Sequence, residues 1–264
     1  MNLNTDRMLA QKDSAIGWIT FNNPARHNAV SLAMWEALHQ IVDDYALDDA
    51  IRVIVVQGAG ARAFVSGADI SEFGEKRSAP EAIKHYESVG QAAQLALKEV
   101  GKPTIAMIHG YCVGGGVSVA LGCDLRIASE RATFAVPAGK LGLGYQFSDV
   151  RKLVEVVGPA FAREIFYTAR QFTAEEALAM GLINRMVPVE GLESFVRDYA
   201  NAIAGNAPLT VASLKTLVAQ VLKDESERDA KLCEDVVRGC FASADYVEGR
   251  QAFMEKRKPV FRGR

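Results

Sequence analysis

The chain has 264 residues, of which 49% are hydrophobic, and this is enough for one large domain or for a domain with an appendage. Charged residues make up 23% and the net charge is -2, so the sequence gives no electrostatic reason to expect binding to nucleic acid or to an anionic membrane. No apolar run is long enough to span a bilayer, and the polar N-terminus lacks a signal or transit pattern, so we expect a cytoplasmic protein.

The first segments of the chain alternate between strand and helix patterns. Apolar and polar residues alternate over residues 15–21, which predicts a strand, and Pro24 ends it because proline supplies no backbone N–H. Ser31 can cap a helix whose apolar residues then recur at helical spacing up to Tyr45. The mainly apolar segment at residues 51–57 (Ile-Arg-Val-Ile-Val-Val-Gln) predicts a buried strand. This strand–helix–strand order is typical of an α/β layer architecture.

Further along the chain, strands give way to helices. A polar segment over residues 74–80 predicts a mobile loop, and a helix is expected from residue 81 to about residue 100. Short apolar segments predict three more strands, at residues 104–108, 125–128 and 132–136. Helical spacing then dominates and predicts helices at residues 161–168, 174–180, 192–204, 211–222 and 230–241.

The four cysteines and four histidines are scattered along the chain. No Cys-x-x-Cys pair occurs, and His109 with Cys112 is the nearest approach to metal-ligand spacing. We therefore expect buried free thiols in a reducing compartment and no metal site.

Two glycine turns stand out, each after a β-rich segment. Gly114, Gly115 and Gly116 interrupt an apolar run and precede small residues that favour a helix. A helix start has unpaired N–H groups and a partial positive charge, so backbone amides here can hold a developing negative charge. The second turn, residues 58–70, follows the strand at residues 51–57. Tight packing of a glycine turn against a strand explains either feature equally well when it is taken alone.

Together the two turns resemble a known family. Residues 64–70 (Phe-Val-Ser-Gly-Ala-Asp-Ile) and 109–116 (His-Gly-Tyr-Cys-Val-Gly-Gly-Gly) are similar to motifs of the enoyl-CoA hydratase/isomerase (crotonase) superfamily. Four further segments are similar to motifs of the same superfamily, in the same order, at residues 23–29, 101–106, 173–184 and 253–258. The resemblance covers nearly the whole chain.

The resemblance implies a fold and an assembly. The implied fold is α/β, a crotonase-like spiral of ββα units over residues 1–195 that carries the CoA and oxyanion site. A helical C-terminal trimerisation region follows over residues 196–264, so a homotrimer or a dimer of trimers is implied as well. The observed change from strand-rich to helix-rich sequence near residue 160 fits this order.

The resemblance also implies which residues bind an acyl-CoA substrate. Two backbone N–H groups that polarise the thioester carbonyl match Ala68 and Gly115. The positions that would contact CoA are Arg26, Asn28, Ala29, Ala68, Ile70 and Lys256. Lys256 matches a lysine that reaches the nucleotide phosphates, in some members from a neighbouring subunit. Asp69 and Asp124 belong to family motifs and are expected to be structural. Because CoA is part of the substrate, no separate cofactor is expected.

Both hydratase carboxylates are missing from this sequence. The two glutamates that position and activate water in enoyl-CoA hydratases match Ser118 and Ala138 here, and Ser71 stands where many hydratases have lysine. Activation of water needs a base within hydrogen-bonding reach, which alanine and an unassisted serine do not supply. We therefore expect the enolate-stabilising half of the machinery without the usual proton-transfer half, and efficient hydration is doubtful.

The loop beyond Ala138 holds candidates for the missing groups, namely Tyr145, Gln146 and Asp149. A tyrosine with an ordinary pKa of about 10 is a poor base at neutral pH. Asp149 would serve equally well as the N-cap of the following helix. A carboxylate of the substrate, or a bound bicarbonate, is a third candidate because Ser118 and Ala138 are small and leave room for it.

The sequence as a whole predicts an acyl-CoA thioester-processing enzyme of the enoyl-CoA hydratase/isomerase type. Decarboxylation, isomerisation and hydrolysis of a CoA ester stay open as reactions. The missing glutamates also leave open a non-catalytic protein that binds acyl-CoA. A matched pair of backbone donors favours the enzyme, because a binding module has little need of it.

Overall fold

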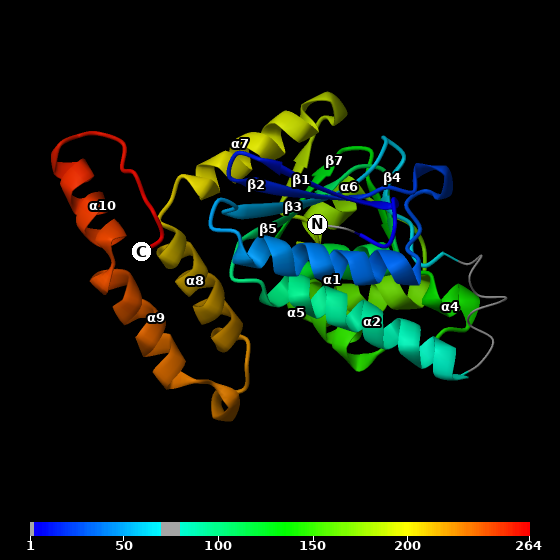
Figure 1. Cartoon of the computed structure of the whole chain (residues 1–264). Coiled ribbons are helices and arrows are strands. Elements are labelled where there is room, and N and C mark those ends of the chain that lie inside the picture. The colour runs from blue at the N-terminus through cyan, green and yellow to red at the C-terminus, as the bar shows by residue number, and fades with distance from the viewer. Residues whose placement is uncertain (1–2, 70–79) are drawn as a thin grey trace.

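Two β-sheets and the helices that cover them make up the core (Figure 1), in a computed structural model that describes residues 3–69 and 80–264. Strands of the described part that form the larger sheet are, in spatial order, β1 (Met8–Asp13), β2 (Ile16–Phe21), β3 (Val53–Gly58), β5 (Thr104–Ile108), β7 (Leu125–Ser129) and β10 (Arg185–Val187). Those that form the smaller sheet are β4 (Ala63–Val65), β6 (Tyr111–Val113), β8 (Thr133–Ala135) and β9 (Phe172–Thr173). Pairing is parallel except between β1 and β2 and between β8 and β9.

The chain passes repeatedly from the larger sheet to the smaller one and then into a helix. β3 leads to β4 and α2 (Pro80–Glu99), β5 leads to β6 and α3 (Gly115–Gly122), and β7 leads to β8 and α4 (Ala138–Leu141). This succession confirms the expected α/β class and the expected ββα units.

Helix α1 (Leu32–Leu47) begins where the sequence predicts. The Ser31 hydroxyl accepts a hydrogen bond from the Met34 N–H, which satisfies one of the unpaired donors of the first turn. The apolar side chains of α1 at helical spacing are buried, as the pattern requires, up to Tyr45.

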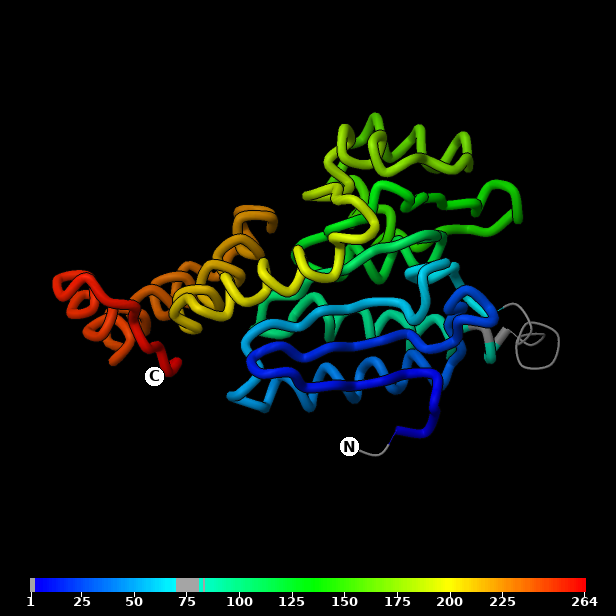
Figure 2. Tube along the Cα trace, turned by 90° about the horizontal axis from the view of Figure 1, so that it is seen from above, coloured from blue at the N-terminus to red at the C-terminus, as the bar shows by residue number. Residues whose placement is uncertain are grey.

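The middle strands of the larger sheet are buried on both faces because their side chains alternate between two apolar clusters. Ile54, Val56 and their neighbours on one face pack with α1, α2 and α3. Val53 and Val55 on the other face pack with α7 (Leu192–Ala204). Figure 1 shows the sheet between these layers, with α1 and α2 on one side and α7 on the other, and Figure 2 views the same layers from the α7 side. Such two-sided burial explains the continuous apolar run of β3.

The second half of the described chain is mainly helical. Its helices are α5 (Phe147–Thr168), α6 (Ala174–Ala179), α7 (Leu192–Ala204), α8 (Pro208–Val221), α9 (Ala230–Ala242) and α10 (Ala244–Met254). Short 3-10 turns lie at Val189–Gly191 and Glu225–Glu227 in this half and at Pro24–Arg26 in the first half. Helix α5 is kinked at Gly158, which has φ +75° and precedes Pro159. No single described helix has the length and apolarity that crossing a membrane requires, although Val189–Ala204 and Pro208–Val221 meet those criteria jointly as a pair bent by 101°.

Most predicted elements occur at the predicted places, and the misses are short or polar. The strand at residues 104–108 and the helix at residues 192–204 match β5 and α7 residue for residue. Helix α5 starts at Phe147, well before the expected residue 161. Elements that the sequence did not predict are β1, β4, β6, β9, β10, α4 and α10. The expected mobile loop at residues 74–80 lies almost wholly outside the described residues.

The predicted boundary after residue 195 falls inside α7. Because α7 packs on the larger sheet through Leu192, Val196 and Ala200, it belongs with the core. The part that projects from the core begins with α8, and α8, α9 and α10 extend to the left in Figure 1.

Candidate functional site

The smaller sheet brings three sequence motifs to one edge. Strands β4, β6 and β8 are parallel neighbours, so their carboxyl ends meet at the same edge. Ala68 lies three residues beyond β4, Gly115 two residues beyond β6, and Ala138 three residues beyond β8. Ligands of α/β proteins commonly bind outside the carboxyl ends of parallel strands, so this edge is the candidate site.

The two glycine turns lie against each other at this edge. A Cβ atom placed on Gly67, whose φ is +110°, would lie 4.0 Å from the Gly115 nitrogen. A Cβ atom placed on Gly115 would lie 3.9 Å from the Gly67 carbonyl carbon, to which the Ala68 nitrogen is bonded. The backbone amides of Ala68 and Gly115 are therefore neighbours, although 47 positions of sequence separate them.

Both amides are left without a backbone acceptor in the described part of the chain. The Val30 N–H donates to the Gly67 carbonyl (2.9 Å), and the Val30 carbonyl accepts from the Asp69 N–H (3.0 Å). The Ala68 N–H, between these two positions, takes part in neither bond. Gly115 is the first residue of α3, so its N–H has no partner within the helix. Two unpaired donors at a helix start can hold the oxygen of a developing oxyanion.

Glycine at position 116 lets the triple glycine pack closely against β4. A Cβ atom on Gly116 would lie 2.1 Å from the Val65 carbonyl oxygen, which backbone geometry does not allow. The Gly114 N–H also donates to the Ala135 carbonyl of β8 (2.9 Å). Absence of a side chain at Gly116 thus lets α3 start close to the sheet and directly beside Gly67.

The predicted CoA loop runs next to Ala68. Val30 forms an isolated parallel bridge with Ala68, and Arg26 pairs with the buried carboxylate of Asp69 at 3.3 Å. Asn28 is fully buried, and its amide group donates to the Ala63 carbonyl (2.8 Å) among others. The Asn28 side chain therefore shapes the loop, and a contact with CoA must come from its backbone.

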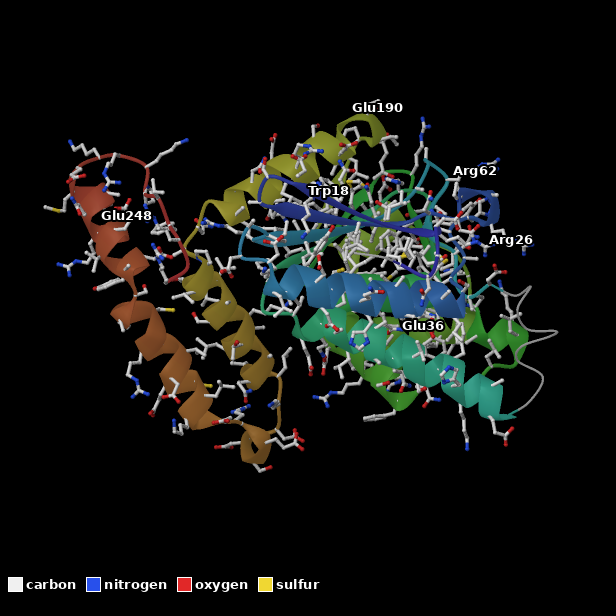
Figure 3. All side chains as sticks on the ribbon, viewed as in Figure 1. Trp18, Arg26, Glu36, Arg62, Glu190 and Glu248 are labelled. Carbon is white, nitrogen blue, oxygen red and sulfur yellow. The ribbon has the colours of Figure 1, made fainter. Side chains whose placement is uncertain are left out.

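The other two residues expected to contact CoA are Ile70 and Lys256. Ile70, like Ser71, lies outside the described residues. Lys256 follows α10, whose Glu248 lies at the opposite side of the molecule from Arg26 (Figure 3). The structure therefore does not bring Lys256 to the CoA loop of its own chain. A contact between them requires a neighbouring subunit, which the resemblance allows.

The two positions that lack carboxylates are both buried. Ser118 lies on α3, three residues after Gly115, and is 6% exposed. Ala138 is the first residue of α4 and is 8% exposed. Residues three apart on a helix share a face, so Ser118 lies above Gly115. Ala68, Gly115 and Ser118 are thus neighbours, and Ala138 follows β8 at the same edge of the smaller sheet.

Tyr145 lies in the loop between α4 and α5 and is partly buried against the core. Its ring packs edge-on against Phe166, with ring centroids 5.1 Å apart. Burial raises the pKa of Tyr145 to about 12, while a hydrogen bond with Ser118 opposes that rise. The phenol is therefore neutral over the physiological pH range and can donate a proton, but it is a still poorer base than an ordinary tyrosine.

Asp149 is neither the expected N-cap nor a free carboxylate. The N-cap of α5 is Gln146, and Asp149 lies within the first turn, where a negative charge interacts favourably with the helix dipole. Its carboxylate pairs with Lys152 at 3.3 Å, and Lys152 also donates to the buried Gln94 at 3.1 Å. The expectation of an N-cap was wrong by three positions.

The two motif aspartates hold backbone and side-chain donors. Asp69 pairs with Arg26 and Arg7. Asp124 accepts from the Thr104 N–H (2.8 Å) and from Lys215 (2.8 Å), and so joins β5 to α8. These bonds fit the structural roles expected for both.

Trp35 is a site residue that the sequence did not single out. Its ring comes within 3.9 Å of the place that a Cβ atom on Gly115 would take. Its indole N–H is buried without a hydrogen-bond partner in the described part of the chain. In the sequence Trp35 is one more apolar residue of α1, and no local signal separates it from the core.

The cysteines form no disulfide, and Cys112 and Cys123 are buried thiols whose pKa is raised by burial. Within residues 3–69 and 80–264, no group of three or more His, Cys, Asp or Glu side chains could hold a metal ion.

Comparisons with known proteins identify the family. A family model described as enoyl-CoA hydratase/isomerase matches residues 11–264. The chain is 30% identical to the short-chain-enoyl-CoA hydratase of Clostridium acetobutylicum, with 98% of this chain and 97% of the relative covered. It is 34% identical to the carnitinyl-CoA dehydratase of Proteus mirabilis, with 90% and 91% covered.

A solved structure gives the same result for the fold. An enoyl-CoA hydratase/carnithine racemase from Magnetospirillum magneticum superposes with a TM-score of 0.94 at 34% identity, covering 99% of this chain and 97% of that one. The spiral of ββα units with a helical C-terminal region is thus the crotonase fold. With a family match over nearly its whole length and relatives of this identity, the chain belongs to the enoyl-CoA hydratase/isomerase family.

Proposed function

We propose that the protein is an enzyme that binds an acyl-CoA thioester and stabilises its enolate with the N–H groups of Ala68 and Gly115. The observation that carries this proposal is the approach of the Gly67 turn to Gly115, with both amides lacking a backbone acceptor. Backbone donors need no side-chain ordering at the moment of reaction, so they suit transition-state stabilisation. Family membership supports the thioester of CoA as the substrate class.

The reaction that follows enolate formation differs from ordinary hydration in this proposal. Relatives of the chain are named enoyl-CoA hydratase and carnitinyl-CoA dehydratase. Here Ser118 and Ala138 occupy the positions matched to the hydratase glutamates, and Asp149 is paired with Lys152. Isomerisation, decarboxylation or hydrolysis of a CoA ester is therefore favoured over efficient addition of water.

The CoA portion would lie along the first loop of the chain. Arg26, Asn28 and Ala29 precede Val30, whose backbone bridges to Ala68. Arg26 is half-exposed and positively charged, so it can meet a phosphate while still pairing with Asp69. Ile70 and Lys256 complete the proposed contacts, with Lys256 coming from a neighbouring subunit.

The first experiment mixes the purified protein with crotonyl-CoA and follows the loss of the enoyl-thioester absorbance. We expect binding with turnover far below the usual enzyme range of ~1–10³ s⁻¹. A panel of acyl-CoAs with mass spectrometry of the products then identifies the reaction. Turnover of crotonyl-CoA within that range would contradict the loss of hydratase chemistry, and turnover of no panel member would contradict an enzyme.

Substitution of one amide donor tests the proposed site directly. Gly115→Pro removes the N–H at the first position of α3, where proline fits helix geometry. We expect turnover of the panel substrate to fall by about 10²–10³-fold. Gly115→Ala is the matched control, since it keeps the N–H and its Cβ atom meets its nearest neighbours only at 3.8–3.9 Å. Equal rates for the two variants would contradict a donor at Gly115.

A non-catalytic acyl-CoA-binding protein is the second candidate, and the two missing carboxylates favour it. That function predicts saturable CoA-ester binding, no product from any panel member and unchanged binding in Gly115→Pro. Isothermal titration of the same panel separates the two candidates.

We also propose a homotrimer or a dimer of trimers, because large apolar residues of α9 and α10 such as Phe241, Phe253 and Met254 are exposed in a single chain. Sedimentation of a monomer at micromolar concentration would contradict it. A cytoplasmic location stays a prediction from the sequence.

A further inference from the structure

Arg126 is a cation buried at the far end of the helix that carries Gly115. Among the Lys and Arg side chains of residues 3–69 and 80–264, it alone is buried, with 7% of its surface exposed. Its side-chain hydrogen bonds within that part of the chain go to carbonyl oxygens and to no carboxylate. Burying a charge without a carboxylate beside it is costly, so the contacts that it makes instead must be important to the fold or to the site.

The guanidinium closes the carboxyl end of α3. Its Nη1 donates to the Cys123 carbonyl at 2.8 Å and to the Ala120 carbonyl at 3.4 Å, and its Nε donates to the Leu182 carbonyl at 2.8 Å. Ala120 lies in the last turn of α3, and Cys123 is its C-cap. The last carbonyls of a helix carry a partial negative charge, which a cation satisfies. Arg126 thus binds the negative end of the helix whose positive end is Gly115.

The backbone holds Arg126 in place on β7. Arg126 pairs with Ala106 of β5 in the larger sheet. Its N–H donates to the Asn184 side-chain oxygen at 2.8 Å, and its carbonyl accepts from the Asn184 N–H at 2.8 Å. At the other end of α3, the Gly114 N–H donates to the Ala135 carbonyl of β8 at 2.9 Å. Both ends of α3 are therefore held to strands.

Water does little to screen the charge along α3. Six of the eight residues of this helix are buried, and a helix of that length spans only about 12 Å. Charges interact more strongly through a low-dielectric interior than across water. The cation offsets the negative end of the helix, so the positive potential at the Gly115 N–H is larger than the helix alone provides.

We propose that Arg126 is a positioning residue of the oxyanion site: it holds α3 by its last carbonyls, and its charge raises the positive potential that the thioester oxygen meets at Gly115. The proposal rests on the proposed function, because that oxygen must be held by the N–H groups of Ala68 and Gly115. The enolate oxygen is negative and the thioester is neutral, so the charge of Arg126 acts on turnover more than on binding.

Infrared spectroscopy of a bound thioester tests the charge apart from turnover. The ligand is butyryl-CoA, which has no double bond to hydrate, and an isotope label at its thioester carbonyl isolates the carbonyl stretch in a difference spectrum. We expect binding to the parent protein to lower the stretching frequency, because the two amides polarise the carbonyl. Gly115→Pro should lose most of this lowering, which sets the scale for the other variants.

Two changes at Arg126 separate its charge from its shape. Arg126→Gln keeps N–H donors but removes the charge, so part of the frequency lowering should be lost. Turnover of the panel substrate should fall about fivefold with little change in KM, which is the effect of one charge across roughly 18 Å of protein. Arg126→Lys keeps the charge and loses the planar fork of donors, so it should retain most of the frequency lowering and of the turnover.

A third variant leaves Arg126 in place. Asn184→Asp keeps the acceptor of the Arg126 N–H and adds a negative charge beside it, so it should reduce the frequency lowering as well. Arg185→Gln is the matched control, because it removes an exposed charge from the next residue, where water and salt screen it. This control should match the parent protein in frequency and in turnover.

The outcomes separate this proposal from the proposed function. Parent-like frequencies in folded Arg126→Gln and in Asn184→Asp would overturn the role of the charge and leave the oxyanion site in place. Equal losses in Arg126→Lys and Arg126→Gln would overturn it too, because the shape of the side chain would then explain both. If Arg126→Gln does not fold, Asn184→Asp decides alone.

Two results would overturn the proposed function and this proposal with it. One is a carbonyl frequency that binding to the parent protein does not lower. The other is a lowering that Gly115→Pro leaves unchanged, because the thioester oxygen would then not lie at the Gly115 N–H.

Discussion

The core and the C-terminal helices use their apolar residues in opposite ways. In the core, both faces of the larger sheet and the inner faces of α1 and α7 are buried. In α9 no residue is buried, and in α10 only Asp245 and Ala252 are, among the described residues. Phe253 is 83% exposed and Met254 is 81% exposed.

This difference indicates that the two regions obtain their stability from different contacts. The core closes on itself, and the proposed oxyanion site is built entirely from its turns. The C-terminal helices leave many large apolar side chains exposed. Their exposed apolar residues include Leu214, Val218, Val221, Leu222, Leu232, Val237, Phe241, Val247, Phe253 and Met254. Such a surface is expected of a region that completes its packing against other subunits.

The largest expected effect comes from a pair of glycine substitutions, one in each region. Gly116→Ala would force a Cβ atom to within 2.1 Å of the Val65 oxygen, so we expect it to destabilise the core by about 3 kcal/mol. Gly239 is exposed on α9 with no atom near the added Cβ, so Gly239→Ala should stabilise by up to ~1 kcal/mol through helix propensity. Urea unfolding measures both, and equal midpoints would contradict the contrast between the regions.

The next effect concerns association. Phe241 is exposed on α9, so burial of its ring in a trimer would contribute about 2 kcal/mol per contact, and Phe241→Ser should weaken assembly roughly 30-fold. The thermal unfolding of the core should not change. Sedimentation over a concentration series measures the shift, and Tyr167→Ser on α5 of the core serves as a matched exposed control. Dissociation in the control variant alone would place the interface on the core instead.

A smaller effect is expected at the junction of the two regions. Lys215 on α8 donates to the Lys102 carbonyl (3.0 Å) and to Asp124 (2.8 Å), and it is mostly buried. We expect Lys215→Met to cost about 1.5 kcal/mol, because charged hydrogen bonds are lost and Asp124 keeps only Thr104. Lys231→Met removes an exposed pair with Asp235 and should cost less than ~0.5 kcal/mol. Denaturant midpoints of the two variants test this, and equal values would contradict a stabilising role of Lys215 at the junction.

The sequence singles out residues of the candidate site but not the contacts between them. Gly115 follows from the triple glycine and the helix start, because unpaired amides are a local property. That Gly67 touches Gly115 could not be derived locally, since β4 and β6 are three residues each and too short to show a period. The edge-on contact of Tyr145 with Phe166 also depends on how the loop before α5 folds back on that helix.

In the C-terminal region, too, the sequence pattern did not predict every helix. Helical spacing predicted α8 and α9, but α10 carries no clear apolar stripe, and its apolar residues face solvent in a single chain. Its start at Ser243 is capped by a hydroxyl that accepts from the Tyr246 N–H. A cap alone does not identify a helix when the pattern after it is mixed. The positions of such helices follow from tertiary contacts, which a sequence window does not contain.

The smallest expected effect is electrostatic and lies at the end of the C-terminal region. Arg257 and the Val260 N–H bind the Glu248 carboxylate, and they lower its pKa from 4.5 to about 2. A carboxyl whose pKa is lowered on folding stabilises the folded segment above pH 4.5, and that contribution is lost as the pH falls toward 2. Hydrogen exchange of the Val260 amide, corrected for its intrinsic rate, should therefore be faster in Glu248→Gln than in the parent at pH 7.

The difference between Glu248→Gln and the parent should shrink between pH 4.5 and about 2, because the parent carboxyl is then protonated as well. Glu193→Gln on α7 is the matched control, since Glu193 pairs with Arg197 and makes no contact with the Val260 amide. Asp245 holds the Arg262 and Gly263 amides independently, so the tail should loosen only around Val260. A difference that persists unchanged at pH 2 would mean that the Glu248 side chain acts through its shape, and the C-terminal segment would then depend on packing as the core does.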